Sequence, residues 1–186
     1  KVLQQRTLRE GRDIVMLLHE ITAPIVAAVQ GHVMGIGATI VTSCDLIVAF
    51  KDAKIGDPHV SAGLVAGDGG VFSWSAAIGA TRAKRYLLTG QPLLASEAHR
   101  MGLITDLVDA PDQALPMARG LAQHVASLPP LAVQGTKRIF NALQQQRLAA
   151  ALDLSLAVET TTVNSADLLE ALAAITEKRA GRFKNQ

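Results

Sequence analysis

The residues best suited to chemistry lie in two glycine-rich stretches, Gly31–Ala38 and Gly56–Gly70. The second stretch carries three ionisable side chains, Asp57, His59 and Asp68. An imidazole titrates near neutral pH, at about pH 6.5, and a carboxylate partner fixes its tautomer and stabilises its charged form. This group of side chains is therefore suited to moving a proton or activating water.

Gly35 and Gly37 belong to the first stretch. A glycine lets the backbone approach a ligand closely because no Cβ stands in the way. Both glycines lie where a helix is expected to begin, and the free N–H groups of a first helical turn bind negative charge. We therefore expect a backbone hole for a developing oxyanion, faced by the His/Asp group. The alternative is that the two glycines only allow close helix packing.

Each candidate side chain also has a purely structural interpretation. His59 could be a loop histidine bound to a backbone carbonyl, and Asp68 could cap a helix that begins near Gly70. Asp57 precedes a proline and is typical of a turn. Thr39 is typical of a buried helix hydroxyl.

The elements that must position these residues follow from apolar periodicity and from turn residues. Helices are expected over 1–21, 38–43, 70–78, 82–88, 97–101, 112–127, 130–145, 148–163 and 166–178. Buried strands are expected over 25–29, 46–50 and 103–108, with a short extended piece over 54–56. Ser96 is expected to cap the helix over 97–101, and Gly102 to end it. Strand-turn-helix units followed by helices predict an α/β core over 1–110 and a C-terminal helical region over 111–186.

Composition narrows the class of protein. The chain has 186 residues, a formal net charge of +2 and only 3% aromatic residues, which gives little support for nucleic-acid binding. Cys44 is the only cysteine, so no internal disulfide forms and a reducing cytoplasm is the expected compartment. No apolar stretch reaches the ~20 residues of a membrane helix, and no leader is recognisable. The chain begins with Lys1 inside a helical pattern, which suggests a further segment upstream.

Histidines outside the second stretch are not spaced like metal ligands. His19, His32, His99 and His124 have no acidic partner at such a spacing, so structural or surface roles and no metal site are expected.

The order and spacing of several short motifs resemble the crotonase (enoyl-CoA hydratase/isomerase) superfamily over nearly the whole chain. These motifs are Pro24–Gly31, Gly35-x-Gly37, Cys44–Ala49, Gly63-x-x-x-Gly67-x-Gly69-Gly70, Leu88-Thr89-Gly90, Ala98-x-x-x-Gly102-Leu103 and Glu177-Lys178-Arg179. The resemblance implies a β-β-α superhelix without its N-terminal part, followed by a helical trimerisation region. It also implies a homotrimer or a dimer of trimers.

The resemblance further implies an acyl-CoA substrate, with coenzyme A as part of that substrate and no separate cofactor. One oxyanion-hole donor would be the N–H of Ile36, between Gly35 and Gly37, and the second would come from the N-terminal part that this sequence lacks. Lys178 aligns with a family residue near the adenine nucleotide of coenzyme A, with an ordinary surface lysine as the alternative.

Two departures from the family pattern concern catalysis. The two glutamates that hydratases use align with Thr39 and His59, so the usual two-glutamate hydration is expected to be impaired or absent. The stretch from Gly56 to Gly69 is instead similar to the 6-oxocamphor hydrolase branch of β-diketone hydrolases. That likeness implies His59 as the base and Asp68 as its orienting partner, although the branch normally lacks the Gly35-x-Gly37 pair.

Three functions follow as expectations. The first is an enoyl-CoA hydratase/isomerase-type enzyme, a lyase or isomerase of fatty acid metabolism that stabilises an enolate. The second is a C–C bond hydrolase of cyclic β-diketones that uses His59 and Asp68 without coenzyme A. The third is a non-catalytic subunit that keeps the fold.

Overall fold

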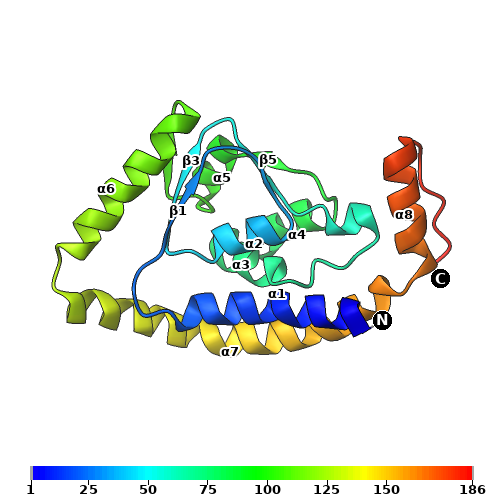
Figure 1. Cartoon of the computed structure of the whole chain (residues 1–186), viewed down its shortest axis with the longest axis horizontal. Coiled ribbons are helices and arrows are strands. Elements are labelled where there is room, and N and C mark those ends of the chain that lie inside the picture. Colours follow the sequence, from blue (N-terminus) through cyan, green and yellow to red (C-terminus); the bar gives the residue numbers. More distant parts are fainter. Residues whose placement is uncertain (1, 186) are drawn as a thin grey trace.

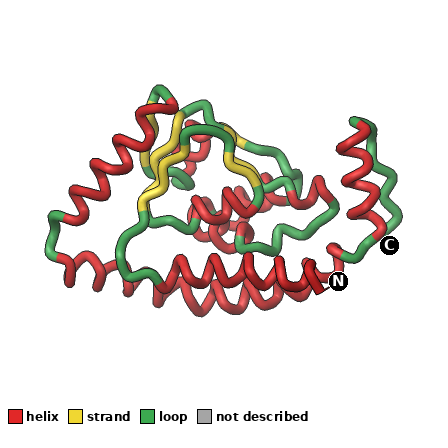
Figure 2. The backbone as a smooth tube through the Cα atoms, viewed as in Figure 1, coloured by secondary structure: helices red, strands yellow, loops and turns green. Residues whose placement is uncertain are grey.

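The computed structural model describes the backbone of residues 2–185, and the side chains of this range apart from positions 2–9, 146, 149 and 150. The strands form two small sheets, which lie in the upper part of Figures 1 and 2. The first is parallel, with strands in the order β1 (Val26–Val29), β3 (Leu46–Phe50) and β6 (Asp106–Val108). The second has the order β2 (Val33–Met34), β4 (Lys54–Gly56) and β5 (Leu93–Leu94), with β5 antiparallel to β4.

Helices lie beside and below these sheets in Figure 1. The first two are α1 (Val2–Glu20) and α2 (Ile36–Thr42), and a short 3₁₀ helix, η1 (His59–Ala62), follows β4. Next come α3 (Gly70–Ile78), α4 (Ala80–Leu87) and α5 (Ala95–Met101). After the 3₁₀ helix η2 (Pro111–Gln113), the chain ends in α6 (Ala114–Ala126), α7 (Pro130–Val163) and α8 (Ala166–Glu177). Among the described residues, no helix combines the length and the apolar character that crossing a membrane requires.

The main core lies between the sheets and helices α2 to α5, where Trp74, Ile55 and Ile104 are almost completely buried. A second cluster joins α1 and α3 to α7 through Val15, Phe72, Leu148 and Leu152. The long helices α1 and α7 run side by side along one edge of the molecule (Figure 1). This packing brings a segment near the C-terminus against the glycine-rich stretches.

Most of the expected elements are present, and three differ. Helix α7 is continuous over Pro130–Val163, where two helices were expected, because positions 146–147 hold good helix formers and no glycine or proline. Helix α5 begins at Ala95 directly after β5, so Ser96 lies inside the helix and the prediction of a Ser96 cap is wrong. The third difference is β6, which covers only Asp106–Val108. The N–H of Leu103 donates to the carbonyl of Ala98 at 2.9 Å and so belongs to the turn that ends α5, and the hydroxyl of Thr105 bonds both backbone groups of Ile47 at 2.8 and 2.9 Å.

Gly102 ends α5 in a left-handed conformation with φ 90°, as expected. The expected helix start at position 1 lies outside the described residues, and the division of the chain at residue 110 stays a prediction.

Candidate active site

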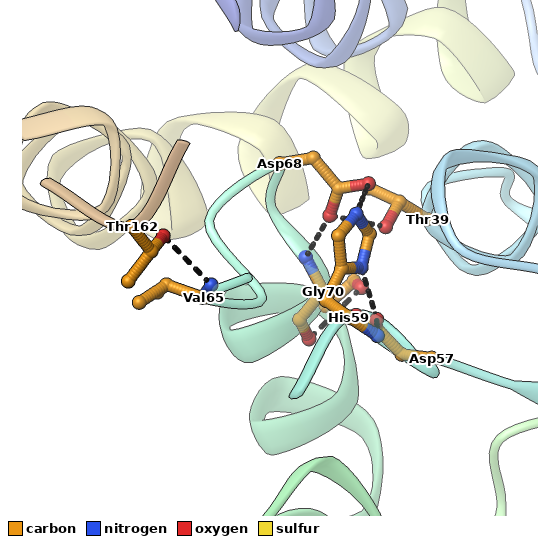
Figure 3. A network of polar contacts seen from close by, with 8 residues as sticks. Thr39, Asp57, His59, Val65, Asp68, Gly70 and Thr162 are labelled. Atoms are coloured by element: carbon orange, nitrogen blue, oxygen red, sulfur yellow. Dashed lines mark hydrogen bonds and ion pairs between the residues drawn. The ribbon is translucent and has the colours of Figure 1, made fainter. Parts of the chain in front are cut away.

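The ring of His59 lies between two carboxylates (Figure 3). Its Nδ1 forms a short hydrogen bond with Oδ1 of Asp57, and its backbone N–H donates to the same oxygen at 3.2 Å. On the other side of the ring, Nε2 is 3.8 Å from Oδ2 of Asp68. An aspartate commonly binds backbone two residues on in a turn, and here the ring of that second residue is held as well.

This geometry changes the roles expected for the two aspartates. Asp68 was expected to orient His59, but Asp57 occupies the Nδ1 side and therefore sets the tautomer of the ring. The turn residue and the orienting residue are the same side chain, Asp57, which is 3% exposed. Asp68 faces Nε2, the nitrogen that remains available for chemistry.

Groups of α2 and α3 together hold the side chain of Asp68 in place. The hydroxyl of Thr39, a fully buried residue, donates to Oδ1 of Asp68 at 3.0 Å. The N–H of Gly70, the first residue of α3, approaches the same oxygen at 3.4 Å. Asp68 thus contacts both a helix start and His59, whereas its Oδ2 is buried without a hydrogen-bond partner.

The first turn of α2 stands beside the imidazole. Gly35 precedes the helix with φ 56° and ψ −129°, a conformation that side chains with a Cβ rarely adopt. Its N–H donates to the carbonyl of Gly56 at 3.0 Å, and a Cβ added to it would lie 3.5 Å from Cε1 of His59. The next N–H, that of Ile36, is in the first turn and so has no partner within the helix.

Glu159 is a member of the site that the sequence did not reveal. It projects from α7, is 4% exposed, and its carboxylate occupies the space where a Cβ of Gly67 would stand. The N–H of Val65 donates to the hydroxyl of Thr162 at 3.2 Å, so the end of α7 is tied to this loop (Figure 3). The available signal was an acid among the apolar residues and threonines of the second half of α7.

Burial and charge shift the pKa values of the cluster. Burial disfavours the charged form of His59, but the hydrogen bond and charge of Asp57, with the charges of Asp68 and Glu159, outweigh it and raise the pKa of His59 to about 9. Burial raises the pKa of Asp68, against the charge of His59 and the hydrogen bond from Thr39. Burial, with the charges of Asp68 and Asp57, also raises the pKa of Glu159 to about 7.

This cluster therefore carries exchangeable protons at neutral pH. His59 is protonated, and Glu159 titrates close to neutrality. A ring N–H⁺ next to a helix start is suited to delivering a proton to a carbon whose neighbouring carbonyl oxygen is held by backbone N–H groups.

The remaining candidate residues lie elsewhere. Lys178 is exposed at the C-cap of α8 with φ 53°, and no described contact joins it to the cluster. His19 and His99 bond backbone carbonyls, and His32 accepts a hydrogen bond from the N–H of Lys54. Among the described residues, Asp57, His59 and Asp68 are the one group whose ligand atoms, within 4.8 Å of one another, could hold a metal ion.

A cavity of about 700 Å³ lies at the opposite end of α2 from Gly35. Its walls come from α1, α2, α3 and α7, and its polar residues include Cys44, Asp45 and Lys137. None of the four ionisable residues of the cluster lines it. Burial raises the pKa of the Cys44 thiol to about 11, so this cysteine is a weak nucleophile at neutral pH.

Comparison with known proteins gives consistent matches. A family model described as enoyl-CoA hydratase/isomerase matches residues 2–186. A probable enoyl-CoA hydratase of Rhizobium meliloti is 34% identical over 88% of this chain and 63% of its own length. A short-chain-enoyl-CoA hydratase of Clostridium acetobutylicum is 32% identical over 95% of this chain and 67% of its own length. The chain thus spans about two thirds of the length of these relatives.

Solved structures agree with the sequence matches. An enoyl-CoA hydratase/isomerase from Mycobacterium paratuberculosis superposes with a TM-score of 0.87 at 34% identity, covering 92% of this chain and 68% of the other. An enoyl-CoA hydratase from Mycobacterium avium subsp. paratuberculosis K-10 gives 0.90 at 27% identity, covering 96% and 72%. The arrangement of helices and strands in Figure 1 is therefore shared with these proteins.

Proposed function

The chain belongs to the enoyl-CoA hydratase/isomerase family, with the predicted crotonase-type fold, and on this premise we propose that it acts on an acyl-CoA thioester through an enolate. One observation carries the proposal. The backbone at Gly35, where α2 begins, lies against the ring of His59, so a hydrogen-bond donor and a proton donor can face one substrate.

The thioester oxygen would accept a hydrogen bond from the N–H of Ile36, and the second donor stays a prediction from the family resemblance. The positive end of the α2 backbone favours the negative charge that develops on this oxygen. One fixed donor of this kind lowers the barrier by about 3 kcal/mol. Gly35 and Gly37 would leave the approach to this N–H open.

His59 and Asp68 would replace the two glutamates of the usual hydratases. In hydration, Nε2–H of His59 would give its proton to the α-carbon of the thioester while water adds to the β-carbon. Asp68, oriented by Thr39, would take the proton that the water loses through its free Oδ2. The 3.8 Å separation between Oδ2 and Nε2 then lets that proton return to His59. A shift of the double bond would use both groups: Oδ2 of Asp68 would remove the proton from the substrate, and Nε2–H of His59 would deliver a proton at the new position.

Three accompanying features belong to the same proposal. Lys178 would bind the nucleotide part of coenzyme A, so replacing it by methionine should raise KM and leave kcat unchanged. The helical C-terminal region would support a homotrimer or a dimer of trimers. The protein would act in the cytoplasm, with no cofactor besides the coenzyme A of its substrate.

The test uses the whole protein with crotonyl-CoA, a 3-enoyl-CoA and a bicyclic β-diketone as substrates. We expect thioester turnover that falls at least ~100-fold in His59→Gln, which is the usual size of a general acid–base contribution. The matched control is His124→Gln, an exposed position on α6, where no change is expected. Thioester turnover that survives in His59→Gln would refute the role of His59.

A C–C bond hydrolase is the second candidate, and the pairing of His59 with Asp57 favours it. A neutral ring held by a carboxylate is suited to activating water for attack on a ketone, so this activity should rise as the pH approaches about 9, the pKa of His59. Turnover of the diketone alone, lost in His59→Gln, would establish this activity in place of the first. A non-catalytic subunit is the third candidate, and turnover of any of the three compounds would dispose of it.

A further inference from the structure

We propose that His59 and Asp68 form a binding site for Zn²⁺, and that the bound ion inhibits the enzyme because it occupies Nε2 of His59. Binding of the ion is independent of the proposed function, whereas its effect on turnover rests on that function. The inference follows from the distance between two side-chain atoms, from a buried oxygen without a partner and from the position of Asp57.

The types of ligand atom favour zinc over the common oxygen-binding cations. Asp57, His59 and Asp68 each offer one ligand atom, and these atoms all lie within 4.8 Å of one another. Imidazole nitrogen and carboxylate oxygen both bind Zn²⁺, at about 2.0–2.2 Å. Calcium and magnesium prefer sites built from oxygen atoms. A site that contains an imidazole is therefore better suited to zinc.

The gap between the ring of His59 and the carboxylate of Asp68 has the size that such an ion requires. Nε2 lies 3.8 Å from Oδ2, and a dashed line joins these two atoms in Figure 3. Two bonds of about 2.1 Å span this distance when they meet at an angle of about 130°. A small approach of the two side chains gives the tetrahedral angle that zinc prefers, and water would fill the remaining positions.

The oxygen that faces the ring is buried and has no hydrogen-bond partner within the part of the chain that the structure describes. This atom is Oδ2 of Asp68, whose side chain is 10% exposed. Oδ1 of the same carboxylate accepts from the hydroxyl of Thr39 and lies 3.4 Å from the N–H of Gly70. These contacts hold the carboxylate with its free oxygen turned toward His59. A buried acceptor without a donor is costly, and a metal ion bound to it removes that cost.

Asp57 supports the ion through the ring and does not have to bind it. It forms a short hydrogen bond with Nδ1, so Nε2 points toward Asp68. A histidine that ligates a metal commonly binds a carboxylate through its other ring nitrogen, which fixes the ring and raises the basicity of the ligating nitrogen. The ion replaces the proton on Nε2, and this proton passes to the solvent. His59 then has no proton to deliver to a substrate.

The first experiment measures binding of the metal alone to the whole protein. Calorimetry with ZnCl₂ should show one ion per chain, and Co²⁺ in its place should give the visible absorption of a tetrahedral site. Asp68→Asn should weaken binding at least ~10-fold, and Asp57→Asn should weaken it ~10–100-fold as a supporting residue does. His59→Gln should abolish binding, whereas His124→Gln, at an exposed position on α6, should keep it. Binding that is unchanged in the three variants of the site would place the ion elsewhere and overturn the inference.

The second experiment measures turnover of crotonyl-CoA with and without the ion. Saturating Zn²⁺ should lower turnover at least ~10-fold, which is within the contribution of one acid–base group, and a chelator should restore it. Turnover that the bound ion leaves unchanged or raises would overturn the inhibition. If the metal-free protein turns over none of its three test compounds, the proposed function is refuted, and calorimetry still decides whether the zinc site exists.

Discussion

Asp57 accepts two hydrogen bonds from His59 on a single oxygen, one from the backbone N–H and one from the ring. A two-residue separation across Pro58 is enough to build the pair, so it forms locally and does not depend on distant packing. The pair fixes which nitrogen of the ring faces the remaining carboxylates.

Replacing Asp57 by asparagine should lower the pKa of His59. The amide keeps the shape of the side chain but removes both the charge and the strongest acceptor, which are the main influences that raise this pKa. NMR titration of a labelled histidine ring measures the change. Asp68→Asn is the comparison and should lower the same pKa by less, because Asp68 acts through its charge alone at 3.8 Å. A pKa that stays at about 9 in Asp57→Asn would contradict this account.

The free energy of unfolding should fall as the pH rises past neutrality. Folding raises the pKa of His59 from 6.5 to about 9, so the folded state binds this proton more tightly than the unfolded state. The resulting stabilisation is complete below pH 6.5 and is lost as the pH approaches about 9. Glu159 acts in the same direction between 4.5 and about 7.

Urea unfolding at several pH values measures this effect. In His59→Gln the loss between pH 6.5 and about 9 should disappear, and in Glu159→Gln the loss at lower pH should disappear. An unchanged pH dependence in both variants would show that the two groups do not titrate as described.

Replacement by alanine should have opposite effects on stability at Gly35 and at Gly37. Gly35 has φ 56°, so Gly35→Ala should destabilise the fold by about 1–2 kcal/mol and lower activity by displacing the start of α2 from His59. Gly37 is helical with nothing within 4 Å of an added Cβ, so Gly37→Ala should be neutral or stabilising by up to about 1 kcal/mol. Thermal unfolding of the two variants checks the contrast, and equal effects would refute it.

Thr39→Val should disturb Asp68 without changing the packing volume. The substitution removes the hydroxyl that donates to Oδ1 at 3.0 Å, inside a fully buried environment. A buried acceptor that loses its donor costs about 1–3 kcal/mol, and the pKa of Asp68 should rise further. Thr136→Val, at an exposed position of α7, serves as the control. Urea unfolding and a pH profile of activity measure the two effects. A Thr39→Val protein that behaves like the Thr136→Val control would contradict the role of Thr39.

Local patterns were sufficient to predict much of this structure. The strands over 46–50 and 54–56 and the helix over 70–78 match the sequence expectations, because apolar runs and glycine punctuation act within a few residues. The His59 and Asp68 neighbourhood also follows from local sequence, since both belong to one loop. Helix α7 runs through the break expected between 145 and 148, because residues 146–147 are good helix formers.

Contacts between residues far apart in the chain could not be predicted from the sequence. Glu159 joins the cluster only because α7 packs along α1 and returns its second half to the loop at Gly67. Its one local signal is an acid among apolar residues and threonines, and this signal does not place the side chain beside Gly67. The choice between Asp57 and Asp68 as the orienting partner likewise depended on side-chain direction, which spacing does not specify.

Helix α7 is unbroken for 34 residues, so the distance and the rotation between any two of its side chains are fixed by the number of residues between them. Near one end, Nζ of Lys137 bonds Asp45 at 2.7 Å and the carbonyl of Ala23 at 2.9 Å, and six turns later Glu159 reaches Gly67. Deleting one residue between these two points would rotate Glu159 by about 100° around the helix axis and draw it back by about 1.5 Å. The segment between them should therefore tolerate many changes of residue type but no change in the number of residues.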